Sequence, residues 1–73
     1  MNYNYSEPFL EIRFKEGNMA RIKRDLITDI YFYKEEGRNV VKISYNKGKD
    51  SDYWYKFYGT MEEFEENSKI VYL

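Results

Sequence analysis

The chain has 73 residues, of which 21% are aromatic, and it carries a formal net charge of −1 with neither cysteine nor histidine. This length suits one small domain, which buries only about 60% of the surface of its unfolded chain. The composition excludes disulfides, His/Cys zinc sites and catalysis by cysteine or histidine, and the net charge points to no polyanionic or membrane partner.

Residues 1–20 contain no apolar run of the signal-peptide kind, and no stretch approaches the roughly 18 apolar residues of a membrane span. The missing cysteines are compatible with a reducing compartment. We therefore expect a cytoplasmic protein without membrane contact.

The N-terminal half alternates in the way that half-buried strands do. Residues 1–8 are a polar arm ending at Pro8, and residues 9–73 are expected to form one β-rich domain. From Phe9 to Lys15 apolar and charged residues alternate, and a turn at residues 16–18 follows. Residues 19–26 alternate again, but Arg24 falls on the apolar side, which indicates a bend or bulge. A break at Thr28 and Asp29 leads into a two-sided strand over residues 30–35.

The second half begins with a turn at residues 36–39 and a strand at residues 40–46. A polar hairpin loop follows at residues 46–52. Next comes a strand with five aromatics among the six residues 53–58, ending before Gly59. Because side chains alternate along a strand, Tyr53, Tyr55 and Phe57 share one face, and Trp54, Lys56 and Tyr58 share the other. We expect the first face to lie in the core against Leu10, Ile12, Phe14, Val41 and Ile43.

Thr60 and Glu63 have the spacing of a capping box and predict a short helix that ends near residues 67–68. The apolar residues 70–73 then form a final short strand or a packed tail. The predicted fold is mainly β (α+β), a small antiparallel meander of four or five strands, curled or partly open as a barrel, with one short helix near the C-terminus.

Catalytic, cofactor and metal residues are not predicted. The four serines lack a hydrolase motif, and a chain this short has little room for a pocket that shifts carboxylate pKa values. Asp50, Ser51 and Asp52 lie beside Lys47 and Lys49, which repel a calcium ion. We expect a non-enzyme without cofactor or small-molecule substrate.

Binding is the function that the aromatic residues indicate. Trp54 and Tyr58 either pack under the helix, where Met61 and Phe64 cover them, or form a protein interface, or stack on nucleic-acid bases. The third alternative uses nearby Lys42, Lys56, Arg38 and Lys47 for phosphates, against the acidic residues 62–66. Tyr31 and Tyr33 pose the choice between sheet packing and an interface. The predicted binding residues are Trp54, Lys56, Tyr58, Tyr31, Tyr33 and Lys42.

Charge is segregated along the chain: residues 1–24 and 38–56 are net basic, and residues 25–37 and 57–73 are net acidic. The basic cluster at Arg21, Lys23 and Arg24 is either a solvated face or a dock for an acidic partner. The glutamates 62, 63, 65 and 66 suit the positive end of the helix dipole, or engage a basic protein surface.

In size and in its richness in Tyr, Lys, Asn and Glu, the whole chain resembles compact orphan proteins encoded by phages and other mobile elements of AT-rich bacteria. The resemblance implies a protein that binds and blocks a host protein. We therefore expect a non-catalytic protein-binding module, with a possible homodimer as a further partner. The alternative is a single-stranded nucleic-acid-binding domain that uses an aromatic and basic sheet face.

Overall fold

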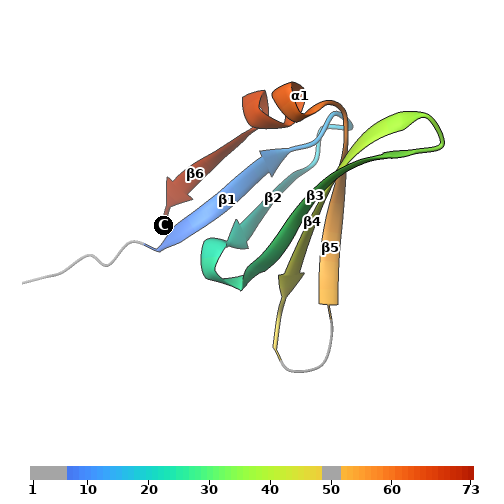
Figure 1. The fold of residues 1–73 in the computed structure, drawn as a ribbon. Coiled ribbons are helices and arrows are strands. Elements are labelled where there is room, and N and C mark those ends of the chain that lie inside the picture. Colours follow the sequence, from blue (N-terminus) through green and yellow to red (C-terminus); the bar gives the residue numbers. More distant parts are fainter. Residues whose placement is uncertain (1–6, 49–51) are drawn as a thin grey trace, which may run out of the picture.

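The computed structural model describes residues 7–48 and 52–73, which form six strands in two antiparallel sheets, one short helix and one 3₁₀ turn. The first sheet has the order β2-β1-β6 and contains β1 (Pro8–Arg13), β2 (Met19–Lys23) and β6 (Ser68–Tyr72). The second has the order β3-β4-β5 and contains β3 (Ile27–Glu35), β4 (Arg38–Asn46) and β5 (Asp52–Tyr58). Helix α1 (Met61–Glu66) links β5 to β6 at one end of the two sheets (Figure 1).

The predicted class, mainly β with one short helix near the C-terminus, is confirmed. The strands number six rather than four or five, because residues 68–72 form a full strand along β1. Within the described residues no ladder joins the two sheets, so the strands do not close into a barrel. The single meander of the prediction is divided between two sheets.

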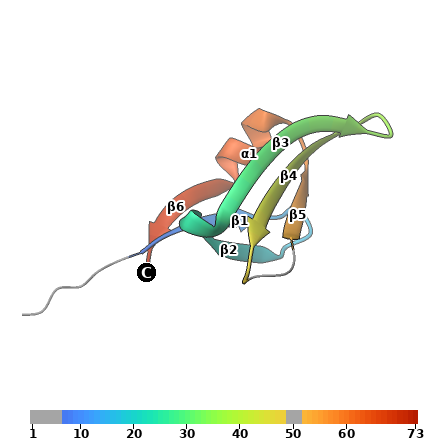
Figure 2. The same cartoon turned by 60° about the horizontal axis from the view of Figure 1, so that its bottom comes forward.

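The chain passes from the first sheet to the second at the predicted bend. Residues Arg24–Leu26 form a 3₁₀ turn, η1, so β2 ends at Lys23 and β3 begins at Ile27 in the other sheet (Figure 2). The break expected at Thr28 and Asp29 is instead a bulge inside β3, where the pairing with β4 shifts between Ile27 and Asp29. A strand that changes sheets turns such a corner through a bend or bulge.

The β3–β4 hairpin has a two-residue turn, shorter than the predicted residues 36–39. Glu36 and Gly37 both have positive φ, 51° and 77°. This is the backbone of a type I′ turn, whose twist matches that of the strands it joins. Arg38 and Asn39 therefore belong to β4 and pair with Glu35 and Lys34.

The core lies between the two sheets, beneath the helix. Phe64 is the buried residue of α1, and its ring centroid lies 5.5 Å from that of Phe57 and 6.4 Å from that of Phe32. Phe14 packs against the margin of this cluster. The buried cluster comprises Leu10, Ile12, Ile22, Val41, Ile43, Phe57 and Phe64.

The predicted core face of β5 is correct for Phe57 and wrong for its two neighbours. Phe57 is buried, whereas Tyr53 and Tyr55 are 42% and 36% exposed. Their rings stack on Tyr45, each with centroids 5.7 Å apart. The strands of the first sheet have only five or six residues, against nine in β4 and seven in β5. The far end of the β4–β5 hairpin therefore extends past the sheet that would cover it (Figure 1).

The predicted capping box is present. The Thr60 hydroxyl accepts a hydrogen bond from the Glu63 N–H at 3.1 Å, and the Thr60 N–H donates to the Glu63 carboxylate at 2.8 Å. The N–H groups of Thr60 and Glu63, which have no partner within the helix, are thereby satisfied. The helix ends before Asn67, as expected.

The two ends of the described chain lie side by side. The N–H of Glu7 donates to the carbonyl of Leu73 at 3.0 Å, and the N–H of Leu73 returns a bond to Glu7 at 3.1 Å. The remaining residues of the predicted arm, 1–6, lie outside the described residues, as do residues 49–51 of the polar loop. In the described ranges, no helix has the length and apolar character to span a membrane.

Candidate interaction surface

All six residues predicted for binding project from one side of the second sheet. Val41, Ile43 and Phe57 point into the core, and side chains alternate along each strand. The residues between them therefore point away from the first sheet. We call this outward side the aromatic face; it comprises Asp29, Tyr31, Tyr33 and Glu35 of β3, Arg38, Val40, Lys42 and Ser44 of β4, and Trp54, Lys56 and Tyr58 of β5.

The strand register arranges these side chains in rows across the sheet. Lys42 lies between Tyr31 and Lys56. The next row along β4 places Val40 between Tyr33 and Tyr58. On the other side of Lys42, Ser44 lies between Asp29 and Trp54. The expected pairing of residues 40–46 with 53–58 is thus confirmed, and it brings two separate sequence clusters together.

Two basic side chains of β4 lie over aromatic rings of β5. The Lys42 ammonium is 4.9 Å from the centroid of the Trp54 ring, and the Arg38 guanidinium carbon is 4.0 Å from that of Tyr58. Both distances lie within the range of cation–π attraction. Each pair joins neighbouring rows, so the aromatic rings are held at defined places on the face.

Lys56 is held by a carboxylate from the opposite edge of the sheet. Its ammonium donates to both oxygens of Glu35, at 2.9 and 3.2 Å. This hydrogen bond to Glu35 raises the pKa of Lys56, in spite of partial burial that lowers it. The pair spans β4 diagonally above Val40, and with Tyr33 and Tyr58 alongside, Val40 is buried although it faces outward.

The helix leaves the aromatic face uncovered, which answers the question that the sequence left open. Phe64 packs on the inward-facing rings of Phe57 and Phe32, and Met61 is exposed. Trp54 is consequently 54% exposed. Beside it is a shallow hollow of about 470 Å³ lined by Thr28, Asp29, Tyr31, Lys42, Ser44 and Trp54.

Sequence reasoning missed the two carboxylates of this surface. Asp29 and Glu35 are an even number of residues away from Tyr31 and Tyr33 along the strand, so strand alternation alone could have placed them on the same face. The Lys56–Glu35 pair was not visible, because it joins β3 to β5 across an intervening strand. The face therefore carries three basic and two acidic groups rather than an unbroken basic lining.

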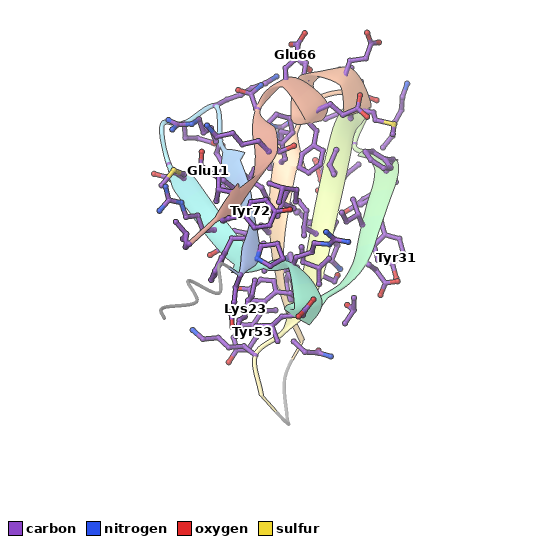
Figure 3. The ribbon with its side chains drawn as sticks, turned by 90° about the vertical axis from the view of Figure 1, so that its left-hand side faces the viewer. Glu11, Lys23, Tyr31, Tyr53, Glu66 and Tyr72 are labelled. Carbon is purple, nitrogen blue, oxygen red and sulfur yellow. The ribbon has the colours of Figure 1, made fainter. Side chains whose placement is uncertain are left out.

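The outer side of the first sheet carries a second cluster, built around a buried carboxylate. Glu11 is only 2% exposed and lies between Arg21 and Lys69 in the strand register. The Arg21 Nε donates to its Oε1 at 2.9 Å, and the Arg13 Nε and Lys69 Nζ lie 3.4 and 3.8 Å from its Oε2. Figure 3 shows Glu11 and Tyr31 on opposite sides of the molecule, so this cluster is separate from the aromatic face.

The Glu11 cluster makes the free energy of unfolding depend on pH in the acidic range. The hydrogen bond from Arg21, with the charges of Lys69 and Arg13, lowers the pKa of Glu11 from its ordinary 4.5, although desolvation opposes the shift. The ionised carboxylate therefore stabilises the fold above its unfolded pKa, and this contribution is lost as the pH falls through the lower folded pKa. We expect Glu11→Gln to be less stable than wild type at neutral pH and to lose less stability on acidification.

Urea unfolding at neutral pH and at about pH 3 measures this difference. A second carboxylate, Glu63, has its pKa lowered by the Thr60 N–H and by Lys15, so part of the acid dependence persists in the variant. An acid loss as large in Glu11→Gln as in wild type would contradict the assignment.

The other charged groups singled out in the sequence are dispersed. Arg21 is bound to Glu11, whereas Lys23 pairs with Glu7 at 3.0 Å. On the acidic helix, Glu63 caps the N-terminus and pairs with Lys15 at 3.0 Å. Among the residues that the structure describes, no group of three or more acidic side chains is placed to hold a metal ion.

Comparison of the chain with family models, with curated proteins and with solved structures gives no match in any of the three.

Proposed function

We propose that the chain is a non-catalytic protein-binding module whose contact surface is the aromatic face. The observation that carries this proposal is the exposure of Trp54 beside Lys42 on a three-stranded sheet. Tryptophan, tyrosine and arginine dominate the binding energy of protein interfaces. The proposed contact residues are Trp54, Tyr58, Tyr31, Tyr33, Lys42 and Lys56.

The charge pattern favours a protein over a nucleic acid. Phosphate contacts dominate nucleic-acid affinity and need free cationic groups. On this face the Lys56 ammonium is already bound to Glu35, and Asp29 lies in the same row as Trp54, on the other side of Ser44. A mixed pattern of charges around aromatic anchors is typical of a protein interface, where it selects the partner.

A single-stranded nucleic acid is the second candidate. Its support is the combination of Trp54 and Tyr58 on one strand with Lys42 and Arg38 within reach. Bases stack on such rings with little sequence preference. The chain has one tryptophan, so its fluorescence reports this binding directly.

The resemblance in size and composition supports a host protein as the partner, bound and blocked in the cytoplasm by a protein of phage or mobile-element origin. The aromatic face is consistent with this role, because an inhibitor of this kind needs a contact surface and no catalytic groups. Its origin, its location and the identity of the partner are part of the proposal.

The test compares Trp54→Ala with Tyr53→Ala in capture of partners from lysate of the source cells. Trp54 lies on the aromatic face, whereas Tyr53, its neighbour on β5, is similarly exposed on the other side. We expect Trp54→Ala to weaken binding of the captured protein by at least about 30-fold, the effect of losing a hot-spot residue of about 2 kcal/mol. Tyr53→Ala should bind as wild type does.

Both variants should fold, because neither residue is buried. Equal binding by wild type and Trp54→Ala would contradict the proposal. Titration of oligonucleotides at low salt separates the second candidate: quenching of Trp54 fluorescence that salt reverses would establish it in place of the first.

A further inference from the structure

Strand β3 is an edge strand whose central residues carry no charge; its bulge at Ile27–Asp29 and its charged residues 29, 34 and 35 lie toward its ends. In the described part of the chain it pairs with β4 alone, and its nine residues include none that is buried. The four central residues, Ile30–Tyr33, are apolar or aromatic and between 36% and 49% exposed. The other edges are shorter and carry a basic residue at or near their centre, Arg21 in β2, Lys69 in β6 and Lys56 in β5.

Edges of this kind pair with other strands, because their backbone groups are available and no central charge opposes contact. Which groups are available follows from the neighbouring ladder. The Gly59 N–H donates to the Asn39 carbonyl at 2.9 Å, so the backbone of Asn39 faces β5. The backbone N–H and C=O groups of successive residues point to opposite edges of a strand, so those of Val40, Lys42 and Ser44 point toward β3. The hydrogen bond from the Thr28 hydroxyl to the Ser44 carbonyl agrees with this direction.

The residues of β3 opposite these, Tyr31 and Tyr33, consequently bond inward to β4. Their neighbours Ile30, Phe32 and Lys34 direct N–H and C=O groups away from the sheet. The edge thus offers a regular row of donors and acceptors over the same residues that expose apolar side chains.

We propose that β3 is a homodimer interface, in which β3 of a second copy pairs antiparallel across a two-fold axis at Tyr31. Ile30 of each copy then lies opposite Phe32 of the other, and each of these two pairs exchanges two backbone hydrogen bonds. The β3-β4-β5 sheets of the two copies then join into one sheet of six strands. This interface is the backbone edge of β3 and adjoins the aromatic face, with which it shares Tyr31 and Tyr33; the faces of the two copies become continuous.

Charge disfavours the neighbouring register in which the axis lies at Phe32. Residues opposite each other in an antiparallel pair share a face, so the register can shift only in steps that keep this parity. Moving the axis to Phe32 would place Asp29 of each copy opposite Glu35 of the other, and like charges directly opposite are destabilising. With the axis at Tyr31, Asp29 lies opposite Tyr33, and no two like charges are opposed.

The side of β3 that faces helix α1 offers a further contact for the second copy. Met61 of α1 is exposed beside β3, next to a hollow of about 280 Å³ whose lining includes Phe32, Lys34 and Met61. Ile30 of the second copy, opposite Phe32, would lie at this hollow. A two-fold contact is self-limiting, so the pairing ends at a dimer rather than continuing into a fibre.

Sedimentation equilibrium of the full chain, from micromolar to near-millimolar concentration, tests the association. The expected mass rises with concentration to twice 9.0 kDa. Ile30→Lys, which places an ammonium opposite Phe32, should remain monomeric throughout. Met19→Lys adds the same charge at an exposed position of β2 and should dimerise as wild type does.

Cysteine cross-linking tests the register, and it is unambiguous because the chain has no cysteine of its own. Tyr31→Cys should form a disulfide-linked dimer on mild oxidation, since residues opposite in a non-hydrogen-bonded pair have Cβ atoms about 4.5–5.5 Å apart. Tyr33→Cys, on the same face of the same strand, should not, because its two copies lie about 13 Å apart.

A wild-type mass of 9.0 kDa at every concentration would overturn the proposal, as would cross-linking at 33 in place of 31. The outcome is independent of the proposed function. Trp54→Ala should dimerise normally while losing the captured partner, so failure of one proposal leaves the other standing.

Discussion

Phe57→Ala is expected to remove a large part of the domain's free energy of unfolding. Phe57 is a buried residue of β5 at the centre of an aromatic cluster, with ring centroids 5.5 Å from Phe64 and 6.4 Å from Phe14. Truncating a buried phenylalanine costs about 3–5 kcal/mol. A domain of this length has a free energy of unfolding of about 4–10 kcal/mol in all, so one substitution removes a large part of it.

Urea unfolding followed by circular dichroism measures the loss. Tyr53→Ala is the matched control, because Tyr53 lies on the same side of β5 but extends past the first sheet and is half exposed. It should cost less than about 1 kcal/mol, within the range of surface substitutions. Equal losses in the two variants would mean that the cluster around Phe57 does not hold the sheets together.

Phe64→Ala is expected to detach helix α1. The helix has six residues, and Phe64 is the one that it buries. A helix this short is unstable without packing, even with the capping box that Thr60 and Glu63 supply. We expect a loss of about 3–5 kcal/mol together with the helical part of the far-ultraviolet dichroism.

Met61→Ala is the control on the same helix, since Met61 is exposed and alanine favours the helix. It should change the free energy of unfolding by about 0.5 kcal/mol or less. The double variant Phe57→Ala/Phe64→Ala should cost less than the two single losses together, because their rings contact each other. Strict additivity of the two losses would contradict this contact.

The strands were predictable wherever one side of the strand is covered. Residues 9–13 and 19–23 alternate because one face lies on the core and the other in water, and the structure has strands there, although the first strand ends at Arg13 rather than at Lys15. The capping box predicted the start of α1 at the right residue, since that signal is local. The bend at Arg24 was also predictable from neighbouring residues, because an arginine on the apolar side of a strand indicates that the strand ends or bends there.

Predictions failed where burial depends on a distant element. Tyr53, Tyr55 and Phe57 are alike in the sequence, but only Phe57 lies beneath the first sheet and the helix. The two-sided strand predicted at residues 30–35 left open which of its sides is covered, and none of the nine residues of β3 is buried. Strand alternation states which side chains share a face, and it contains no information on how far the opposite sheet extends.

The candidate surface was predicted as two separate groups, Trp54, Lys56 and Tyr58 on one strand and Tyr31 and Tyr33 on another, each joined to Lys42 only if its strand pairs with residues 40–46. Their union depends on β4, which lies between them and brings Lys42 into the same face. The pair between Lys56 and Glu35 depends on three strands at once. Contacts of this kind follow from register, which is set by the turn at residues 36–37 and by the buried side chains.

For the aromatic strand at residues 53–58, the sequence alone determined that its side chains divide into two sets on opposite faces, because that division follows from the geometry of an extended backbone. It also determined the helix that follows, because a cap involves only neighbours. Which set is covered was decided by the tertiary structure. The helix turns inward to place Phe64 on Phe57, and Trp54 is left in water because the second sheet has a partner on one side only.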